Sequence, residues 1–499
     1  GTGAATGVIN ITLKKSAKSA ISGNAYINMG TQNTTETSKV SAQDFNQGLS
    51  VNGTVNKVSY MTTLNSTETK GMSEAAGENF EEDTFSRVNV LQKIGFKAND
   101  KLSFDFFGNY DRIKNTFDNS FDGFIANSDD LNNNSFSEQF RIGFLPKYKY
   151  NKGEFAINAG ASTIDRTINI SNSWSGTVDV YNYTGRTASI DAFNKYNFSK
   201  QVYLVLGAQY QYFDMTQKDA YTDVARERAK FNLFDPYATL VFNSEFGLNI
   251  NAGARFNTHS EYGNQIVYNF NPSYSFENLP LKVLASYSTA FITPSLYQLY
   301  GPYGNLDLTP EENATAEFGF ESQLLNKKLT INAVGFYREE ENTFGFFYDS
   351  STFESFYINN KGINNAKGVE TSIRYTLSER FNIGGNYTFT EVEQQLNRLI
   401  PKHKGNVDLN YMFKRGTFGI NYQYVDQRSD AYYDSNIWAT QAVNLAAYQL
   451  VNSNISYELM PNRLHVFGTV TNILNDDFQE LIGYNTRGRN YKLGLNFMF

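Results

Sequence analysis

Apolar and polar residues alternate one by one along much of this chain. At its end, Tyr491, Leu493, Leu495, Phe497 and Phe499 are apolar or aromatic, and the residues between them are mostly polar or small. Because the side chains of a strand point alternately to its two faces, this alternation predicts a strand with one apolar face. Such a final strand is typical of a transmembrane β-barrel, whose closing strand shows lipid an apolar face and pairs along both edges.

The same alternation recurs in residues 246–256, 381–389 and 418–424, where the second face is polar but carries little charge. Such a face is expected of a wall that lines a wet lumen or contacts an internal plug. A one-sided soluble sheet is the alternative, but alternation in so many segments, with so few helical windows, is unusual for it.

Segments of roughly ten to fifteen residues bounded by turn signals give about 22 strands, an even number within the range of outer-membrane barrels. They are predicted near residues 20–30, 44–56, 57–68, 84–97, 101–113, 136–149, 153–168, 185–198, 201–213, 230–243, 246–259, 264–277, 281–292, 313–325, 328–341, 366–377, 380–394, 403–414, 416–428, 446–459, 462–474 and 486–499. We therefore predict an all-β fold, a transmembrane antiparallel β-barrel.

The connections between these segments alternate in length. Short turns are expected at 98–100, 151–153, 199–200, 244–245, 378–380 and 460–462, and long loops at 114–135, 169–184, 214–229, 293–312, 342–365 and 429–445. Short turns on one rim and long loops on the other are typical of the periplasmic and extracellular ends of such barrels. A barrel of this size encloses a lumen that would leak unless it were plugged.

Composition supports one long β unit over several ordinary domains. No linker or change of composition divides the 499 residues. The chain contains 34 Tyr and 41 Phe but only 2 Trp. Excess tyrosine suits the two interfacial girdles of a barrel, where amphipathic rings sit at the level of the lipid headgroups. No run of about 18 apolar residues occurs, which excludes a helical membrane protein.

The chain offers little chemistry for catalysis. Cysteine is absent, which removes disulfides, thiolate metal sites and cysteine nucleophiles, and His259, His403 and His465 have no zinc-binding spacing. No nucleophile elbow or phosphate-binding loop followed by a helix is present. The net charge of −7 argues against nucleic acid as a partner. We therefore expect no enzyme and no nucleic-acid contact.

Residues 118–129 have the oxygen spacing of a calcium loop. Asp118, Ser120, Asp122 and Asp129 stand at its first, third, fifth and twelfth positions, glycine stands at the sixth, and Phe124 stands at the seventh, where such loops use a backbone carbonyl. The neighbouring Asp130 could complete the six to eight oxygens that calcium prefers. A solvated acidic loop is the alternative, because Asp129 replaces the usual glutamate and no flanking helices are evident.

Four segments of the chain, taken together, resemble the TonB-dependent outer-membrane receptors over its whole length. They are Gly7-Val8-Ile9-Asn10-Ile11-Thr12-Leu13-Lys14-Lys15; Phe291–Tyr300 with Gly304-Asn305 and Leu308-Thr309-Pro310-Glu311; Gly368-Val369-Glu370; and Thr471–Phe478 with Gly488-Arg489-Asn490-Tyr491. The first segment resembles the last strand of the family's plug domain, and the second resembles the family's mid-barrel signature. The third resembles another family signature, and the fourth resembles the closing hairpin. Within the family, the compact length and the stretch from Leu296 to Gly301 are most similar to cobalamin receptors.

The resemblance implies a domain division and a set of partners. Residues 1–17 would be the remnant of the plug domain, and residues 18–499 the barrel. In the family, a box upstream of the plug engages a periplasmic energy-coupling protein, so the chain as given is not expected to perform energised uptake alone. We expect this sequence to be part of a longer receptor, and we favour this interpretation over a scaffold barrel. The barrel is expected to be integral to the bacterial outer membrane and surrounded by its lipid.

The resemblance also implies site residues. Cobalamin receptors use aspartates of an extracellular loop to bind calcium, which supports a structural calcium ion at residues 118–130; no other cofactor is expected. Tyr297, Tyr300, Tyr303 and Asn305 are candidates for substrate contact, since a broad, partly apolar ligand is held by aromatic faces with a few polar anchors. Packing of the loop is the alternative for these rings. In the final strand, Tyr491, Phe497 and Phe499 are expected to signal assembly, because family barrels end on a phenylalanine that the insertion machinery recognises.

Three functions are consistent with these observations. The first is a TonB-dependent receptor for a scarce bulky small molecule, either cobalamin or a siderophore or other metal chelate. The second is a passive porin, against which the plug segment at residues 7–15 argues. The third is a structural or interaction barrel in a larger outer-membrane complex, whose loops bind a surface lipoprotein.

Overall fold

The structure is a computed structural model that describes residues 14–37, 40–77, 80–118, 129–172, 175–349, 351–393, 397–434, 437 and 439–499. Twenty-two strands form its wall. They are β1 (Ser22–Gly30), β2 (Asp44–Val55), β3 (Val58–Met72), β4 (Asp83–Lys97), β5 (Leu102–Thr116), β6 (Asn134–Tyr150), β7 (Gly153–Asn172), β8 (Thr177–Asn197), β9 (Val202–Lys218), β11 (Lys230–Asn243), β12 (Leu248–His259), β13 (Gly263–Ser275), β14 (Leu281–Ile292), β15 (Glu311–Leu324), β16 (Leu329–Glu341), β19 (Ile363–Ser378), β20 (Phe381–Val392), β21 (His403–Phe413), β22 (Gly416–Val425), β25 (Tyr448–Met460), β26 (Leu464–Thr471) and β27 (Asn490–Met498).

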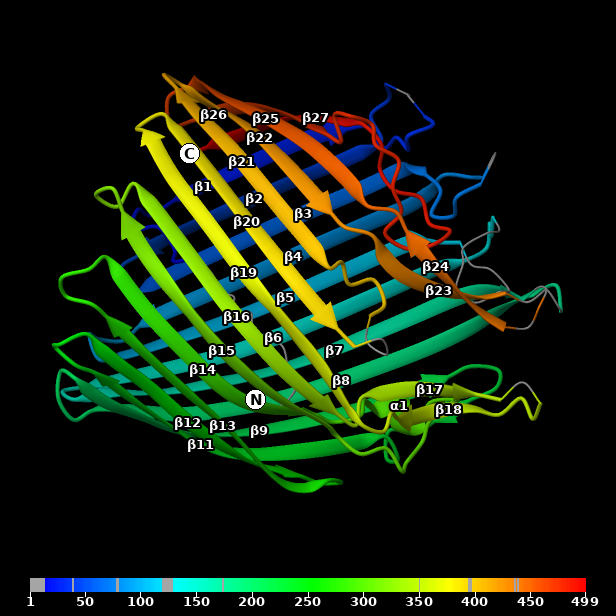
Figure 1. Cartoon of the computed structure of the whole chain (residues 1–499), viewed down its shortest axis with the longest axis horizontal. Coiled ribbons are helices and arrows are strands. Elements are labelled where there is room, and N and C mark those ends of the chain that lie inside the picture. Colours follow the sequence, from blue (N-terminus) through cyan, green and yellow to red (C-terminus); the bar gives the residue numbers. More distant parts are fainter. Residues whose placement is uncertain are drawn as a thin grey trace.

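Each strand pairs antiparallel with the next, and the sheet closes on itself to make a barrel (Figure 1). The closing pair is β1 with β27, in a register that places Ala25 opposite Phe497 and Met29 opposite Leu493. Closure leaves the wall without an unpaired edge, which a membrane-spanning sheet requires. The predicted fold class of an antiparallel barrel with about 22 strands is confirmed, and each predicted strand matches one observed strand.

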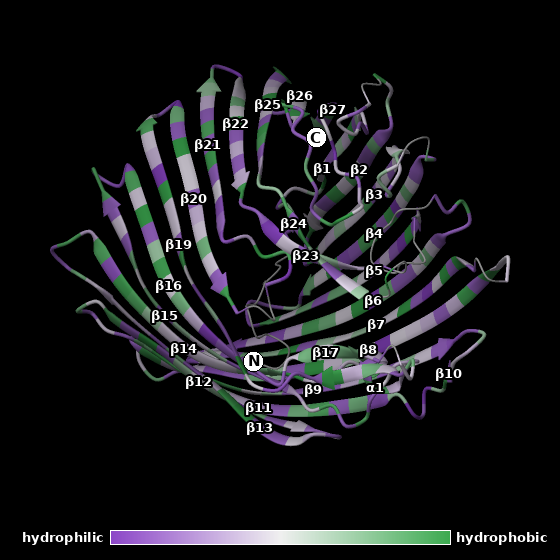
Figure 2. Cartoon of the chain, turned by 45° about the vertical axis from the view of Figure 1, so that its right-hand side comes forward, coloured by the Kyte–Doolittle hydropathy of each residue, from purple (hydrophilic) through white to green (hydrophobic). Residues whose placement is uncertain are grey.

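Hydrophilic and hydrophobic residues alternate along the strands of the wall (Figure 2). On β27, the side chains of Tyr491, Leu493 and Phe497 are exposed on the outside by 47%, 60% and 43%. On the inside, charged side chains form pairs such as the Arg87 guanidinium with the Asp111 carboxylate, 2.5 Å apart. The period-two pattern in the sequence therefore reflects lipid on one side of the wall and a polar lumen on the other.

Six smaller elements lie at the end of the barrel that carries the long loops (Figure 1). They are β10 (Asp223–Val224), α1 (Leu296–Tyr300), β17 (Phe344–Tyr348), β18 (Ser355–Asn359), β23 (Arg428–Asp434) and β24 (Ala439–Leu445). β10 pairs with β9, β17 pairs with β18 and β23 pairs with β24, so the last two pairs are separate hairpins. All six fall in segments predicted as long loops, apart from Arg428 at the start of β23, which was placed at the end of a predicted strand, and none of the six was predicted.

The predicted plug remnant, residues 1–17, lies mostly outside the described residues. The described part, from Lys14 onward, contains no strand before Ser22, and it contacts the wall through the Ser16 hydroxyl, which donates to the Tyr60 carbonyl at 3.0 Å. The assignment of these residues to a plug domain stays a prediction. Among the described helices, none combines the length and the apolar character needed to cross a membrane.

Candidate functional site

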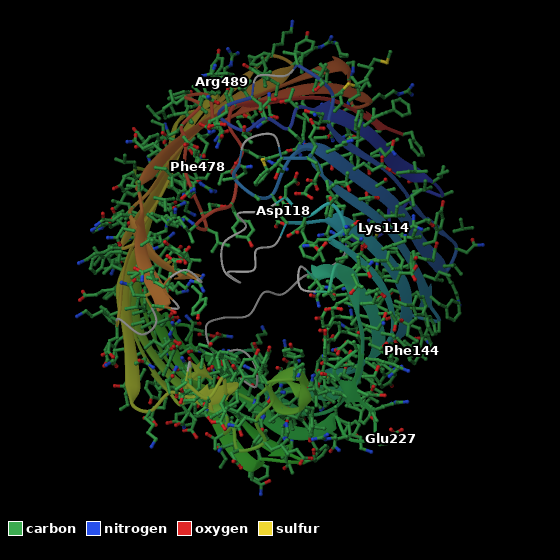
Figure 3. The ribbon with its side chains drawn as sticks, turned by 90° about the vertical axis from the view of Figure 1, so that its right-hand side faces the viewer. Lys114, Asp118, Phe144, Glu227, Phe478 and Arg489 are labelled. Atoms are coloured by element: carbon green, nitrogen blue, oxygen red, sulfur yellow. The ribbon has the colours of Figure 1, made fainter. Side chains whose placement is uncertain are left out.

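The short helix α1 anchors the mid-barrel loop to the inner wall, and the end-on view shows it inside the ring of strands (Figure 3). It begins with a capping box: the Gln298 backbone N–H donates to the Ser295 hydroxyl at 3.2 Å, and the Ser295 N–H donates to the Gln298 side-chain oxygen at 2.8 Å. Leu296 is buried and packs in a cluster with Phe231 and Leu233 of β11. Apolar packing and capping together explain why residues 295–300 form a helix here.

Tyr297 and Tyr303 belong to a chain of aromatic rings at the extracellular mouth, which we call the mouth cluster. Its ring-to-ring centroid distances are 6.3 Å from Tyr183 to Tyr297, 6.4 Å from Tyr297 to Tyr357, 5.4 Å from Tyr357 to Phe346 and 5.5 Å from Phe346 to Tyr303. Tyr303 and Phe346 are exposed by 48% and 51%, so the cluster offers open aromatic surface to a ligand. Burial, and then the neighbouring Tyr357, raise the pKa of Tyr297.

Two of the four predicted substrate residues have other surroundings. Tyr300 packs against the buried cluster around Leu296, and the Arg228 guanidinium lies 5.7 Å from the centre of its ring. The Asn305 amide donates to the Tyr357 carbonyl at 2.8 Å, and its oxygen accepts from the Asp307 N–H at 2.9 Å. Asn305 thus holds the loop against the β17–β18 hairpin. Their roles in substrate contact stay predictions.

The mouth cluster includes three rings that the sequence reading missed. Tyr183 comes from β8, and Phe346 and Tyr357 come from the β17–β18 hairpin. The four aromatic residues of Phe344-Gly345-Phe346-Phe347-Tyr348 are typical of a strand, but they lie within a segment predicted as a loop. The contribution of Tyr183 depends on tertiary structure, because more than a hundred residues separate it from Tyr297.

Asp118 and Asp129, the first and last positions of the predicted calcium loop, come together with Glu81. One carboxylate oxygen from each of the three residues lies within 4.8 Å of those of the other two. Asp118 is 3% exposed and lies on the lumen side of the wall (Figure 3). Glu81 comes from the loop between β3 and β4, which the sequence reading did not connect with this site.

The backbone around these carboxylates is tied to them by hydrogen bonds. The Asp118 carboxylate accepts from the Ser73 hydroxyl and from the Ala75 N–H, both at 2.9 Å, and from the Asp130 N–H at 3.1 Å. One oxygen of Glu81 is buried and has no hydrogen-bond partner among the described residues. Of the other predicted calcium ligands, Ser120, Asp122 and Phe124 lie outside the described residues, and Asp130 contributes its backbone N–H here.

Burial changes the acidity of a neighbouring carboxyl group. Glu74 lies in the same loop as Glu81, and its carboxylate accepts from the Asp118 N–H at 3.3 Å. Burial raises the pKa of Glu74 above its ordinary value, and the nearby Asp83 and Asp118 charges add to this effect. Carboxylates that crowd together in this way are the arrangement that a bound divalent cation relieves.

The predicted assembly residues lie on the outer face of the closing strand or at its end. Tyr491 and Phe497 are on β27, Phe499 follows it, and Phe499 is 47% exposed with its ring 6.1 Å from that of Phe497. The Phe499 N–H donates to the Gly23 carbonyl at 3.0 Å, so the chain end remains paired with β1. Recognition by insertion machinery stays a prediction for these three residues.

Comparison with known proteins adds family membership to this geometry. Residues 22–473 match the model of the TonB dependent receptor-like β-barrel family. The vitamin B12 transporter BtuB of Vibrio cholerae is 30% identical over 255 residues, which are 50% of this chain and 40% of that protein. The chain thus aligns with less than half the length of the curated relatives it matches.

Solved structures of receptors with the same fold cover nearly the whole chain. A variant of the ferric enterobactin receptor of Pseudomonas aeruginosa, in complex with enterobactin, has a TM-score of 0.82 and 15% identity over 100% of this chain and 84% of its own. The siderophore receptor PirA of Acinetobacter baumannii has a TM-score of 0.80 and 13% identity, with 97% and 81% covered. The copper transporter OprC has a TM-score of 0.81 and 12% identity, with 98% and 81% covered. From its closed barrel and the family match over residues 22–473, this chain belongs to the TonB-dependent receptor family of integral outer-membrane β-barrel proteins.

Proposed function

We propose that this barrel is the membrane part of a receptor that takes up cobalamin with energy from a periplasmic coupling protein. The observation that carries the proposal is the 30% identity to the vitamin B12 transporter over 255 residues, which are half of this chain. Identity at this level favours a shared ligand class more than the similarity of fold does.

The mouth cluster supports a broad, partly apolar ligand. The side chains of Tyr303 and Phe346 are about half exposed, and the tyrosines of the cluster carry hydroxyl groups that can form hydrogen bonds. Large ligands with a flat macrocycle and polar substituents are held by such a combination of aromatic faces and a few polar groups. We assign the first contact with cobalamin to these two rings and to Tyr297 behind them.

The carboxylates of Glu81, Asp118 and Asp129 support a structural calcium ion. Calcium prefers six to eight oxygen ligands, and three carboxylates from two loops supply half of such a set or more when they bind through both oxygens. The ion would join the loop between β3 and β4 to the loop after β5. Ordering of these loops would prepare the mouth for the ligand and lower the entropy cost of binding.

A siderophore or another metal chelate is the second candidate ligand. The observation that favours it is the Arg228 guanidinium, which lies 5.7 Å from the ring centre of Tyr300. Cationic groups next to aromatic rings suit an anionic iron chelate better than they suit cobalamin. The full-length similarity to siderophore receptors is one of fold and does not separate the two ligands.

Equilibrium binding distinguishes these ligands. Cyanocobalamin and a ferric catecholate siderophore are each titrated, with calcium or with a chelator, into the detergent-purified protein expressed from the complete gene. Tight cyanocobalamin binding that weakens on chelation is the expected result. Binding of the siderophore alone would replace cobalamin by the second candidate, and binding of neither would shift the assignment to a scaffold barrel that binds a surface lipoprotein.

A further inference from the structure

The two ends of the barrel carry opposite charge. The ten short turns that join the ring strands at the periplasmic end contain ten Lys or Arg residues and four Asp or Glu residues. The eleven extracellular connections contain nine Lys or Arg residues and 23 Asp or Glu residues. The basic turn residues are Lys57, Lys101, Lys152, Lys200, Lys327, Lys328, Arg380, Lys414, Arg415 and Arg463. Although the whole chain has a net charge of −7, its periplasmic rim is therefore positive.

These cations are not neutralised within the barrel. None of the ten basic turn residues forms a salt bridge with another of the described residues. Of the four acidic turn residues, Asp100 forms a salt bridge with the strand residue Lys97, with 2.8 Å between the Lys97 Nζ and the Asp100 carboxylate oxygen. Lys327, Lys328, Lys414 and Arg415 are all exposed. Their charge is thus available to a partner outside the chain.

A belt of aromatic side chains lies next to the basic turns on the lipid-facing side. Phe198 and Phe246 stand in the turns themselves and are 57% and 61% exposed, and Tyr148, Tyr411 and Tyr457 stand near the strand ends with exposures of 46%, 42% and 38%. Aromatic belts mark the level of the lipid headgroups in a membrane barrel. The basic turns therefore lie at or just beyond the headgroups of the membrane leaflet that faces the periplasm.

One contact joins the two features directly. The Lys152 ammonium lies 6.0 Å from the centre of the Tyr196 ring, which is at the periplasmic end of β8 and stacks edge-on against Phe198. A lysine that lies along an aromatic belt holds its charged end at the height of the phosphate groups. This is the arrangement by which basic residues recognise lipid headgroups at a membrane surface.

We propose that the basic periplasmic turns bind the phosphodiester headgroups of acidic phospholipids, such as phosphatidylglycerol, in the leaflet that faces the periplasm. Each Lys or Arg near an anionic lipid surface strengthens the attraction by about fivefold. The acidic extracellular rim contributes no such attraction. The charge difference between the two ends thus gives the barrel a preferred orientation and a shell of acidic lipid, independently of the ligand that it carries.

The test compares acidic with zwitterionic lipid on the full chain. Phosphatidylglycerol or phosphatidylcholine is added at equal mole fraction to the detergent-purified protein, and the lipids retained are counted by native mass spectrometry at low and high salt. We expect phosphatidylglycerol to be retained at least tenfold more tightly, and this preference to fall with salt. Equal retention of the two lipids by the unaltered protein would overturn the proposal without any variant.

Two variants then locate the site. The first carries Lys327→Gln, Lys328→Gln, Lys414→Gln and Arg415→Gln, and the second carries Lys361→Gln and Lys402→Gln at the extracellular end. Heat-dependent gel migration shows that each variant has folded into a barrel. We expect the first variant to lose at least tenfold of its affinity for phosphatidylglycerol and the second to change by less than twofold. If both variants lost a similar amount of affinity for phosphatidylglycerol per substituted residue, the assignment to the periplasmic turns would be contradicted.

Discussion

The Asp118 carboxylate accepts a hydrogen bond from the Ala75 backbone N–H at 2.9 Å, and this bond joins the loop after β5 to the loop between β3 and β4. Ala75 in turn forms a β-bridge with Tyr484, and its carbonyl accepts from the Asn485 side chain at 2.6 Å. Loops that follow the third, fifth and twenty-first strands of the ring therefore meet around one buried carboxylate. This network positions Glu81 and Asp129 beside it.

Replacement of Asp118 by alanine should destabilise this loop network. The change leaves the buried Ala75 N–H without its acceptor and removes one of the two acceptors of the Ser73 hydroxyl, the other being the Ala75 carbonyl. An unsatisfied buried donor costs about 1–3 kcal/mol. We expect the free energy of unfolding in urea, measured in chelator, to fall by about 2 kcal/mol. Asp307→Ala removes an exposed carboxylate and serves as the control, with no measurable loss expected. An equal effect of the two substitutions would show that Asp118 does not hold the loops.

Calcium should bind to the carboxylate cluster and protect the loops around it. Glu81→Gln and Asp129→Asn each remove one of the three charged ligands, so we expect the calcium affinity, measured by isothermal titration, to fall at least tenfold in each. Asp349→Asn changes a half-buried carboxylate in another loop and should leave the affinity unchanged. Calcium binding that survives both cluster substitutions would place the ion elsewhere.

Tyr303 should contribute to ligand affinity without contributing much to stability. Its ring is 48% exposed and contacts Phe346 edge-on, with 5.5 Å between the centroids. Loss of one stacking ring costs about 1–1.5 kcal/mol of binding, so Tyr303→Ala should weaken cyanocobalamin binding about tenfold. The unfolding midpoint should move little. Tyr221→Ala removes an exposed tyrosine from a neighbouring loop, and an equal loss of affinity in this control would remove the mouth cluster from the binding site.

The sequence predicted the wall of the barrel closely because one physical cause acts on each strand. Lipid on the outside and water on the inside impose a period of two, and this period reveals a strand without knowledge of its partners. The predicted strand at residues 281–292 has the observed bounds of β14, and that at 230–243 has those of β11. The largest differences between predicted and observed strand bounds lie at the extracellular ends of strands. For example, β8 begins at Thr177, whereas the predicted segment begins at residue 185.

The site was predicted only in part because its residues come from several loops. The spacing of Asp118 and Asp129 was visible within one loop, whereas Glu81 joins them from another loop through tertiary structure. Helix α1 has five residues, too few for a helical period, and its formation depends on the capping box at Ser295 and on burial of Leu296. The local sequence pattern therefore predicted individual ligands and aromatic rings, whereas tertiary packing determines which of these residues lie in contact.

The raised pKa of Tyr297 gives the mouth cluster a defined pH dependence. Burial and then Tyr357 disfavour the ionised ring in the folded state, so its pKa lies above that of the unfolded chain. The contribution of Tyr297 to the free energy of unfolding is therefore fully present below the pKa of about 10 in the unfolded chain. It is lost as the pH rises through the higher pKa of Tyr297 in the folded protein. We expect alkaline unfolding above pH 10 to be less steep in Tyr297→Phe than in the unaltered protein. An identical alkaline profile would show that Tyr297 does not ionise in this range.

Phe499 should act in assembly more than in the stability of the finished barrel. Its backbone is paired with Gly23, and this pairing does not depend on the side chain, which is 47% exposed on the outside. Phe96 is a matched control, because its ring is 42% exposed at the same end of the barrel. If insertion machinery reads the terminal ring, Phe499→Ser should lower the amount of folded protein in the outer membrane severalfold, whereas Phe96→Ser should lower it much less. Thermal unfolding of the two purified variants should differ little, since each loses one lipid-facing ring. Equal membrane levels of the two variants would assign Phe499 to lipid contact alone.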